Sequence, residues 1–123
     1  MKKSIVISIN PEHVENIIKG KKKYEYRTKV AKKDINKVII YETFPVKKIV
    51  AEAMIEEIIT LPKDELWNKT KNKSGITKEF YDIYFYGKEI ACAYKLGKVK
   101  VYREPKELED FGLNYAPQSF VYV

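Results

Sequence analysis

One short segment of the chain combines side chains whose chemistry suits contact with phosphates and bases. It reads Gly20-Lys21-Lys22-Lys23-Tyr24-Glu25-Tyr26-Arg27. Lys22 could contact a phosphate as a point charge, whereas Arg27 could clamp a phosphate bidentately or stack on a base. Glu25 lies between cations, so we expect it to stay ionised and to accept hydrogen bonds from a base edge. Lys21, Lys23 and Tyr26 could add charge and a stacking surface to this candidate site.

The same residues also have a purely structural interpretation. In a strand, Lys23, Glu25 and Arg27 would share one face and form a surface row of ion pairs. Such a row is worth roughly a few tenths of a kcal/mol, and Tyr24 and Tyr26 would then face the core. From the residues alone this interpretation is the simpler one, and it predicts no ligand.

The residues before this segment predict the elements that would position it. The β-branched run Ser4–Ile9 is typical of a strand. Asn10 and Pro11 suit the cap and first position of a helix, and Gly20 is a natural helix stop. Residues 22–27 then follow a period of two, which predicts a second strand. The charged segment would therefore form a ledge beside the helix end.

The rest of the chain predicts a small α+β fold. Further strands are expected over residues 38–41, 46–60, 89–96, 98–102 and 120–123, with Gly97 at a bend or bulge. Short helices are expected after Pro62 and Thr77 and over residues 105–111. About six mostly antiparallel strands with three or four short helices would close toward a small β-barrel.

The positive charge is concentrated in the first part of the chain. The 123 residues include 24 Lys and Arg against 17 Asp and Glu, a net charge of +7. The first fifty residues hold thirteen basic and five acidic side chains, whereas the remainder hold eleven and twelve. This asymmetry is typical of a surface that binds a polyanion, RNA first among them, although a solvated lysine-rich face would look the same.

Composition argues against several other classes of protein. The lone cysteine, Cys92, cannot form an internal disulfide, and its apolar surroundings indicate a buried, inert thiol. The one histidine, His13, is far from Cys92 in sequence, so neither a metal site nor a cofactor is expected. His13 should lie near the surface and could act at the mouth of a cleft. With no apolar run of membrane-spanning or secretory type, we expect a cytoplasmic protein without membrane contact.

The spacing Gly-x-Lys-x-x-Glu-x-Arg, met by Gly20, Lys22, Glu25 and Arg27, resembles the signature of the ASCH domain, a member of the PUA-like superfamily. The lead-in Ser8-Ile9-Asn10-Pro11 and the closing Ala116-Pro117-Gln118-Ser119-Phe120 also resemble small, stand-alone prokaryotic and phage-type members. The resemblance covers most of the chain, and we expect a single domain over residues 1–123.

The resemblance implies a PUA-like β-barrel with helices packed around it and a cleft beside the first helix. Carried over by position, Lys22, Glu25 and Arg27 would line this cleft. Ser8, Gln118 and Ser119 would contribute polar groups near its edge, and Asn10 would join them if it is not occupied in capping the helix.

The resemblance also implies a function, because PUA-like domains commonly bind RNA or unusual bases. Our leading hypothesis is a non-catalytic module that binds RNA, another nucleic acid or a modified nucleotide. The second hypothesis is an enzyme, since some family members resemble N4-acetylcytidine amidohydrolases and others resemble ribonucleases. The amidohydrolases use a lysine, a threonine three residues later and a further glutamate. Here Lys22 matches the lysine, Glu25 replaces the threonine and the further glutamate has no equivalent, which leaves Lys22 and Glu25 as an acid/base pair.

A third hypothesis is a protein-interaction domain. The helix expected after Thr77 carries an aromatic stripe, which typically belongs to a core; its members are Phe80, Tyr81, Tyr84 and Phe85. An exposed apolar patch on this helix, over residues 78–86, would instead favour docking to a protein. The sequence does not distinguish RNA from DNA and leaves the oligomeric state open.

Overall fold

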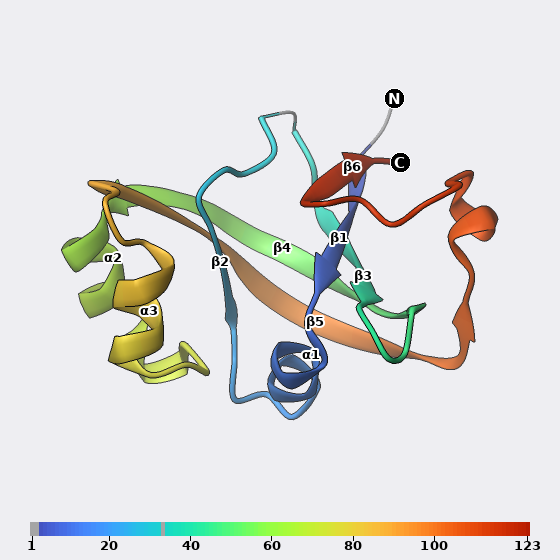
Figure 1. Cartoon of the computed structure of the whole chain (residues 1–123), viewed down its shortest axis with the longest axis horizontal. Coiled ribbons are helices and arrows are strands. Elements are labelled where there is room, and N and C mark those ends of the chain that lie inside the picture. The colour runs from blue at the N-terminus through green and yellow to red at the C-terminus, as the bar shows by residue number, and fades with distance from the viewer. Residues whose placement is uncertain (1–2, 33) are drawn as a thin grey trace.

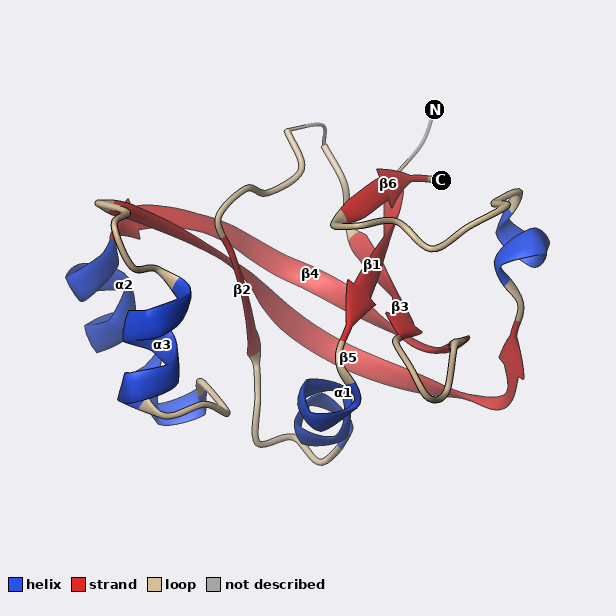
Figure 2. Ribbon diagram, viewed as in Figure 1, coloured by secondary structure: helices blue, strands red, loops and turns tan. Residues whose placement is uncertain are grey.

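A computed structural model describes residues 3–32 and 34–123 and shows a curled sheet with short helices packed against it (Figures 1 and 2). Its strands are β1 (Ser4–Ile9), β2 (Tyr24–Arg27), β3 (Lys37–Glu42), β4 (Lys48–Pro62), β5 (Ile90–Lys106) and β6 (Phe120–Tyr122). The helices are α1 (Pro11–Ile18), α2 (Lys63–Thr70) and α3 (Lys78–Tyr84), with 3₁₀ turns η1 (Lys71–Lys73) and η2 (Leu108–Phe111). None of the described helices is long and apolar enough to cross a membrane.

The six strands of the described chain form one sheet in the order β2-β5-β4-β3-β1-β6. Only the β1–β3 pair is parallel, and the other neighbours are antiparallel. The long strands β4 and β5 run through the middle of the sheet, which curls into a half-barrel (Figure 2). This confirms the predicted α+β fold with mostly antiparallel strands.

Most local predictions hold, but the helix predicted over residues 105–111 is reduced to η2 because β5 runs to Lys106. Another prediction fails in an informative way. β1 and the strand predicted over residues 46–60 are present. The two strands predicted on either side of Gly97 are instead one strand, β5. Pairing with β4 passes from Ile55–Leu96 to Ala53–Val99, so β5 takes up an extra residue at Gly97 as a bulge. The predicted bulge is correct, but hydrogen bonding to β4 carries the strand through it.

The core fixes the position of β2 relative to the helices. α1 packs through Val14 and Ile17 into a cluster with the inward side chains of β1. A separate cluster joins β2 to α2 and α3 through Tyr26, Leu66 and Tyr81. β2 is therefore held between α1 on one side and α3 on the other, as Figure 1 shows. Side chains from all three elements can meet where they converge.

Candidate functional site

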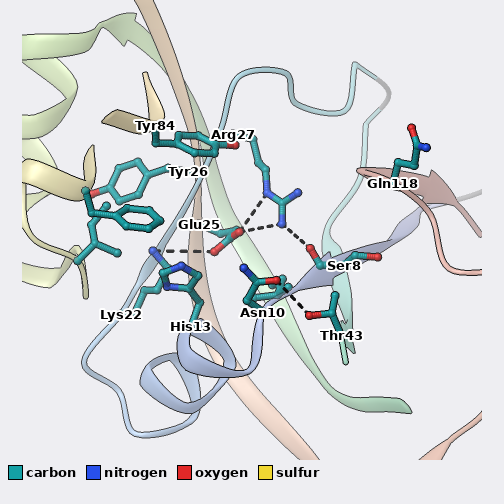
Figure 3. Close-up of a pocket in the computed structure, with 13 residues that line it drawn as sticks. Ser8, Asn10, His13, Lys22, Glu25, Tyr26, Arg27, Thr43, Tyr84 and Gln118 are labelled. Atoms are coloured by element: carbon teal, nitrogen blue, oxygen red, sulfur yellow. Dashed lines mark hydrogen bonds and ion pairs between the residues drawn. The ribbon is translucent and has the colours of Figure 1, made fainter. Parts of the chain in front are cut away.

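A pocket of about 340 Å³ lies where β1, α1, β2 and α3 converge (Figure 3). Its wall combines one charged cluster, two exposed aromatic rings and several uncharged polar groups. The lining residues are Ser8, Ile9, Asn10, His13, Lys22, Glu25, Tyr26, Arg27, Thr43, Ile76, Phe80, Tyr84 and Gln118. A volume of this size is at the lower end of the range for small-molecule sites.

The floor of the pocket is a buried charge cluster. Arg27 donates from Nε and Nη2 to Oε2 of Glu25, at 3.0 and 2.9 Å, and from Nη2 to the carbonyl of Ser8 at 2.7 Å. Lys22 Nζ is 3.9 Å from Glu25 Oε1 and donates to the carbonyl of Ser74 at 3.1 Å. Lys22 and Glu25 are only 3% and 6% exposed. One carboxylate thus serves two cations, which leaves the cluster with a net positive charge.

Burial changes the acid–base chemistry of Lys22. Removal from water lowers the pKa of Lys22 from 10.5, and the negative charge of Glu25 opposes that effect. The ammonium also lies 4.8 Å from the centroid of the Tyr26 ring. Lys22 is therefore a more readily deprotonated amine than a surface lysine, a property that suits a proton-transferring group.

The predicted surface row of ion pairs is wrong. Glu25 is buried and pairs with Lys22 and Arg27, whereas Lys23 is exposed and lies outside the pocket. Lys22 precedes β2 and so does not follow the strand alternation. The other half of that interpretation holds for Tyr26, whose ring is in the core and whose hydroxyl pairs with Thr70 Oγ1 at 2.6 Å.

Two aromatic rings of α3 line the pocket together with the charge cluster. The rings of Phe80 and Tyr84 are nearly parallel, at 8°, with centroids 6.4 Å apart. They are 44% and 39% exposed, whereas Tyr81 and Phe85 are buried. The prediction that the whole stripe is core was therefore half wrong. Aromatic residues at i, i+1, i+4 and i+5 occupy a wider arc than one buried stripe, which is the signal that could have separated the two pairs.

The polar edge of the pocket comes from distant parts of the chain. Ser8 Oγ donates to the carbonyl of Pro117 at 2.6 Å, and Gln118 lines the pocket beside it. Asn10 occupies the N-cap position of α1, but its side chain accepts from Thr43 Oγ1 at 3.1 Å instead of capping the helix. Ser119 lies just outside, where its carbonyl accepts from the amide of Ser8. Thr43 had no local signal in the sequence.

His13 also faces the pocket, although its sequence context gave little reason to expect it. Its ring meets Phe80 edge-on, with centroids 5.2 Å apart. Nδ1 is buried and has no hydrogen-bond partner among the described residues. Burial first, and the charge of Lys22 second, lower the pKa of His13 from 6.5. A neutral imidazole with an unused nitrogen is able to accept a proton or a hydrogen bond.

The lowered pKa of His13 predicts a pH-dependent stability. The unfolded chain takes up a proton near pH 6.5 and the folded chain only at lower pH, so stability should fall as pH drops through 6.5. Replacing His13 with Gln should make the curve flatter between pH 7.5 and 5.5. Urea unfolding of both proteins at these two pH values measures the difference. If native protein and variant lost the same unfolding free energy between these pH values, His13 would titrate alike in the folded and unfolded chains.

The lining of the pocket holds few groups that could support amide hydrolysis or metal binding. Glu25 is the one acidic residue among the described residues that line it. The further carboxylate that the amidohydrolase-like mechanism uses is therefore not present in the lining. Across the described chain, no group of three or more His, Cys, Asp or Glu side chains is placed to hold a metal ion.

The outer side of α3 bears on the third hypothesis. Ile83 and Tyr86 are 76% and 85% exposed, so this helix and the turn after it do present apolar side chains to solvent. That is the observation expected for a protein-docking surface. Phe80 and Tyr84, however, contribute to the pocket instead. Docking to a protein therefore stays a prediction.

Comparisons with known proteins identify one family. The ASCH domain model matches residues 7–113. An ASCH domain-containing ribonuclease of Zymomonas mobilis is 29% identical over 99% of this chain and 85% of that protein. Two Ureaplasma parvum proteins, named ATP synthase subunit alpha and large ribosomal subunit protein uL22, are 33% and 31% identical, but the chain spans only 15% and 39% of their lengths. The crystal structure of ASCH from Zymomonas mobilis superposes with a TM-score of 0.89 at 30% identity, covering 98% of this chain and 87% of that one.

Proposed function

Because the chain belongs to the ASCH domain family, we propose that it binds RNA and holds one unpaired nucleotide in the pocket at the start of α1. The convergence of Lys22, Glu25 and Arg27 on a pocket that aromatic side chains also line is the observation that carries this proposal (Figure 3). The family match and the relative named a ribonuclease support an RNA-related function. The chemistry of the pocket supports the nucleotide as the bound unit.

Each part of the nucleotide has a suitable counterpart. The base stacks against Phe80 and Tyr84, an interaction worth about 1–3 kcal/mol per base. Both hydrogen bonds from Arg27 to Glu25 fall on Oε2, so Oε1 is left to accept from an exocyclic amine. Ser74 takes one of the three Lys22 donors and Glu25 lies near the ammonium, so one donor is left for a phosphate or a base carbonyl. Adenine, cytosine and guanine should therefore bind better than uracil.

The shape of the pocket favours single strands. A cavity of about 340 Å³ has room for one nucleotide unit but not for a base pair. Proteins read RNA sequence mostly where bases are unpaired and can be turned out of the strand. The protein should accordingly prefer single-stranded RNA to a duplex of the same sequence.

The aromatic wall gives a direct test of this proposal. Replacing Phe80 with Ala should weaken binding of a fluorescent single-stranded RNA about tenfold, because one stacking surface is lost. The matched control is Ile83→Ala, which removes an exposed apolar side chain from the same helix outside the pocket. Titrations at 50 and 200 mM salt should also show steep weakening. Equal effects of the two variants, or a flat salt response, would refute the proposal.

The Zymomonas relative favours a second candidate, ribonuclease activity, because this chain covers 85% of a protein named for it. In such a reaction the 2′ oxygen attacks the adjacent phosphorus and loses its proton to a base, and the 5′ oxygen leaves with a proton from an acid. Lys22, with Glu25 as its partner, is placed to transfer a proton or to stabilise charge on the phosphate oxygens. His13, whose side chain lines the pocket, is the alternative base.

A cleavage assay separates the two functions. End-labelled RNA is incubated with native protein and with Lys22→Met purified identically, and an equivalent DNA serves as a substrate without the 2′ hydroxyl. RNA fragments from native protein alone would assign the activity to this site. If the RNA stayed intact in both samples, ribonuclease activity would be rejected and the RNA-binding function alone would stand. N4-acetylcytidine in a parallel tube tests the amidohydrolase alternative.

A further inference from the structure

A second hollow adjoins the nucleotide pocket and shares part of its wall. His13, Ile76 and Phe80 line both, so the pair of side chains in edge-to-face contact, His13 and Phe80, forms a ridge between them. The rest of this hollow comes from α1 and the turn after it, from the first residue of η1 and from the loop that precedes α3. We call it the lysine hollow, and its other lining residues are Glu12, Asn16, Lys21, Lys71, Ser74, Gly75 and Thr77.

The lysine hollow carries two exposed cations. The side chains of Lys21 and Lys71 are exposed, and neither ammonium forms an ion pair or hydrogen bond with the described residues. Glu12 is the one acidic residue among the hollow's described lining residues. The loop beside it is anchored to the nucleotide pocket, because Ser74 accepts from Lys22 and Gly75 accepts from Asn16. The two hollows are thus held in a fixed relation.

The other hollows near the pocket lack this character. The one reached past Gln118 is lined by residues 112–121, and none of these is basic. The one on the far side of α1 has three glutamates, Glu12, Glu15 and Glu42, against a single lysine, Lys19. A polyanion leaving the nucleotide pocket would be repelled or unassisted in those directions. Toward the lysine hollow it meets positive charge.

We infer that the lysine hollow binds the phosphodiester of the nucleotide next to the one in the pocket. The ligand is then a strand of at least two nucleotides that crosses the ridge of His13 and Phe80, and not a free nucleoside. Lys21 and Lys71 neutralise its backbone without reading its sequence. This inference rests on the proposed function, since it takes the base to lie in the first pocket.

Three probes distinguish this inference from the function on which it rests. Cytidine tests the first pocket alone, the dinucleotide CpC tests both hollows, and an eight-nucleotide oligocytidine gives the salt dependence. NMR titrations of native protein measure the first two, and fluorescence anisotropy measures the third. The variant is Lys21→Ala/Lys71→Ala. The control is Lys88→Ala/Lys98→Ala, which makes the same charge change at exposed sites away from both hollows.

The expected result is selective. The Lys21/Lys71 variant should bind cytidine as native protein does, lose at least fivefold for CpC and the oligonucleotide, and show a shallower salt slope, by about 0.7 for each lost phosphate contact. The control should change CpC binding less than twofold. Equal losses in variant and control would overturn the inference while leaving the first pocket intact. Failure of native protein to bind cytidine would instead reject the proposed function.

Discussion

Replacing Glu25 with Gln should destabilise the protein by about 3–5 kcal/mol, because it leaves two buried cations without their counter-charge. Glu25 accepts two hydrogen bonds from Arg27 and faces Lys22, and both cations are largely removed from water. Arg27 cannot lose its proton to escape the cost. Lys22 can, so the variant should lower its pKa further, since the charge of Glu25 is what opposes the effect of burial. RNA binding should also weaken, because Glu25 is part of the charge cluster on the floor of the pocket.

The measurement is urea unfolding of native protein and variant, followed by the fluorescence of Trp67. Glu52→Gln is the matched control, because Glu52 also pairs with a lysine, at 3.3 Å, and accepts from Tyr102, but is more exposed. Loss of an ion pair of that kind should lower the unfolding free energy by about 1 kcal/mol or less. If the two variants lost the same unfolding free energy, the buried cluster would contribute no more to stability than a surface ion pair.

A double variant keeps this prediction testable if Glu25→Gln fails to fold. Glu25→Gln/Arg27→Met removes both the carboxylate and one of the cations that it neutralises. The double variant should be more stable than Glu25→Gln, because part of the unpaired charge is gone. A double variant no more stable than Glu25→Gln would contradict the coupling that the short Arg27–Glu25 contacts imply.

The elements that hold the site could be predicted because their signals are local. The β-branched run of β1, the Asn10-Pro11 start of α1 and the period-two segment of β2 each depend on neighbouring residues only. The continuity of β5 through Gly97 could not, because it is imposed by the ladder to β4. Local patterns gave the elements of the half-barrel, and pairing between distant strands decided where one of them ends.

The interior of the site depends on contacts between residues far apart in sequence. Lys22 is buried because its ammonium meets the carbonyl of Ser74, 52 positions away. Thr43 lies at the pocket because its hydroxyl donates to Asn10, and no pattern in the neighbouring residues indicates this contact. The exposure of Phe80 depends on which face of α3 packs on β2. The sequence therefore supplied the charged residues of the candidate site but not its aromatic wall.

The second large effect is expected from Gly75→Ala, which should weaken RNA binding at least tenfold. Gly75 has a φ of +69° and packs against Lys22 so closely that an added Cβ would lie 2.4 Å from Lys22 Cβ and 3.0 Å from its Cα. Neither atom is the mobile end of a side chain, so the loop or the backbone of Lys22 must move. Overpacking of this kind costs about 1–3 kcal/mol. Movement of either would disturb the floor of the pocket and the ridge beside it.

Gly87→Ala separates this collision from backbone strain. Gly87 has nearly the same φ, +75°, but a Cβ there meets nothing within 4 Å. Both alanines bear the cost of a left-handed conformation, so the difference between their unfolding free energies isolates the contact with Lys22. Gly87→Ala should bind RNA like native protein. If Gly75→Ala also bound normally while losing no more stability than Gly87→Ala, the close packing of the loop on Lys22 would have no part in shaping the pocket, and Lys22 would have to be held by Ser74 and Glu25 alone.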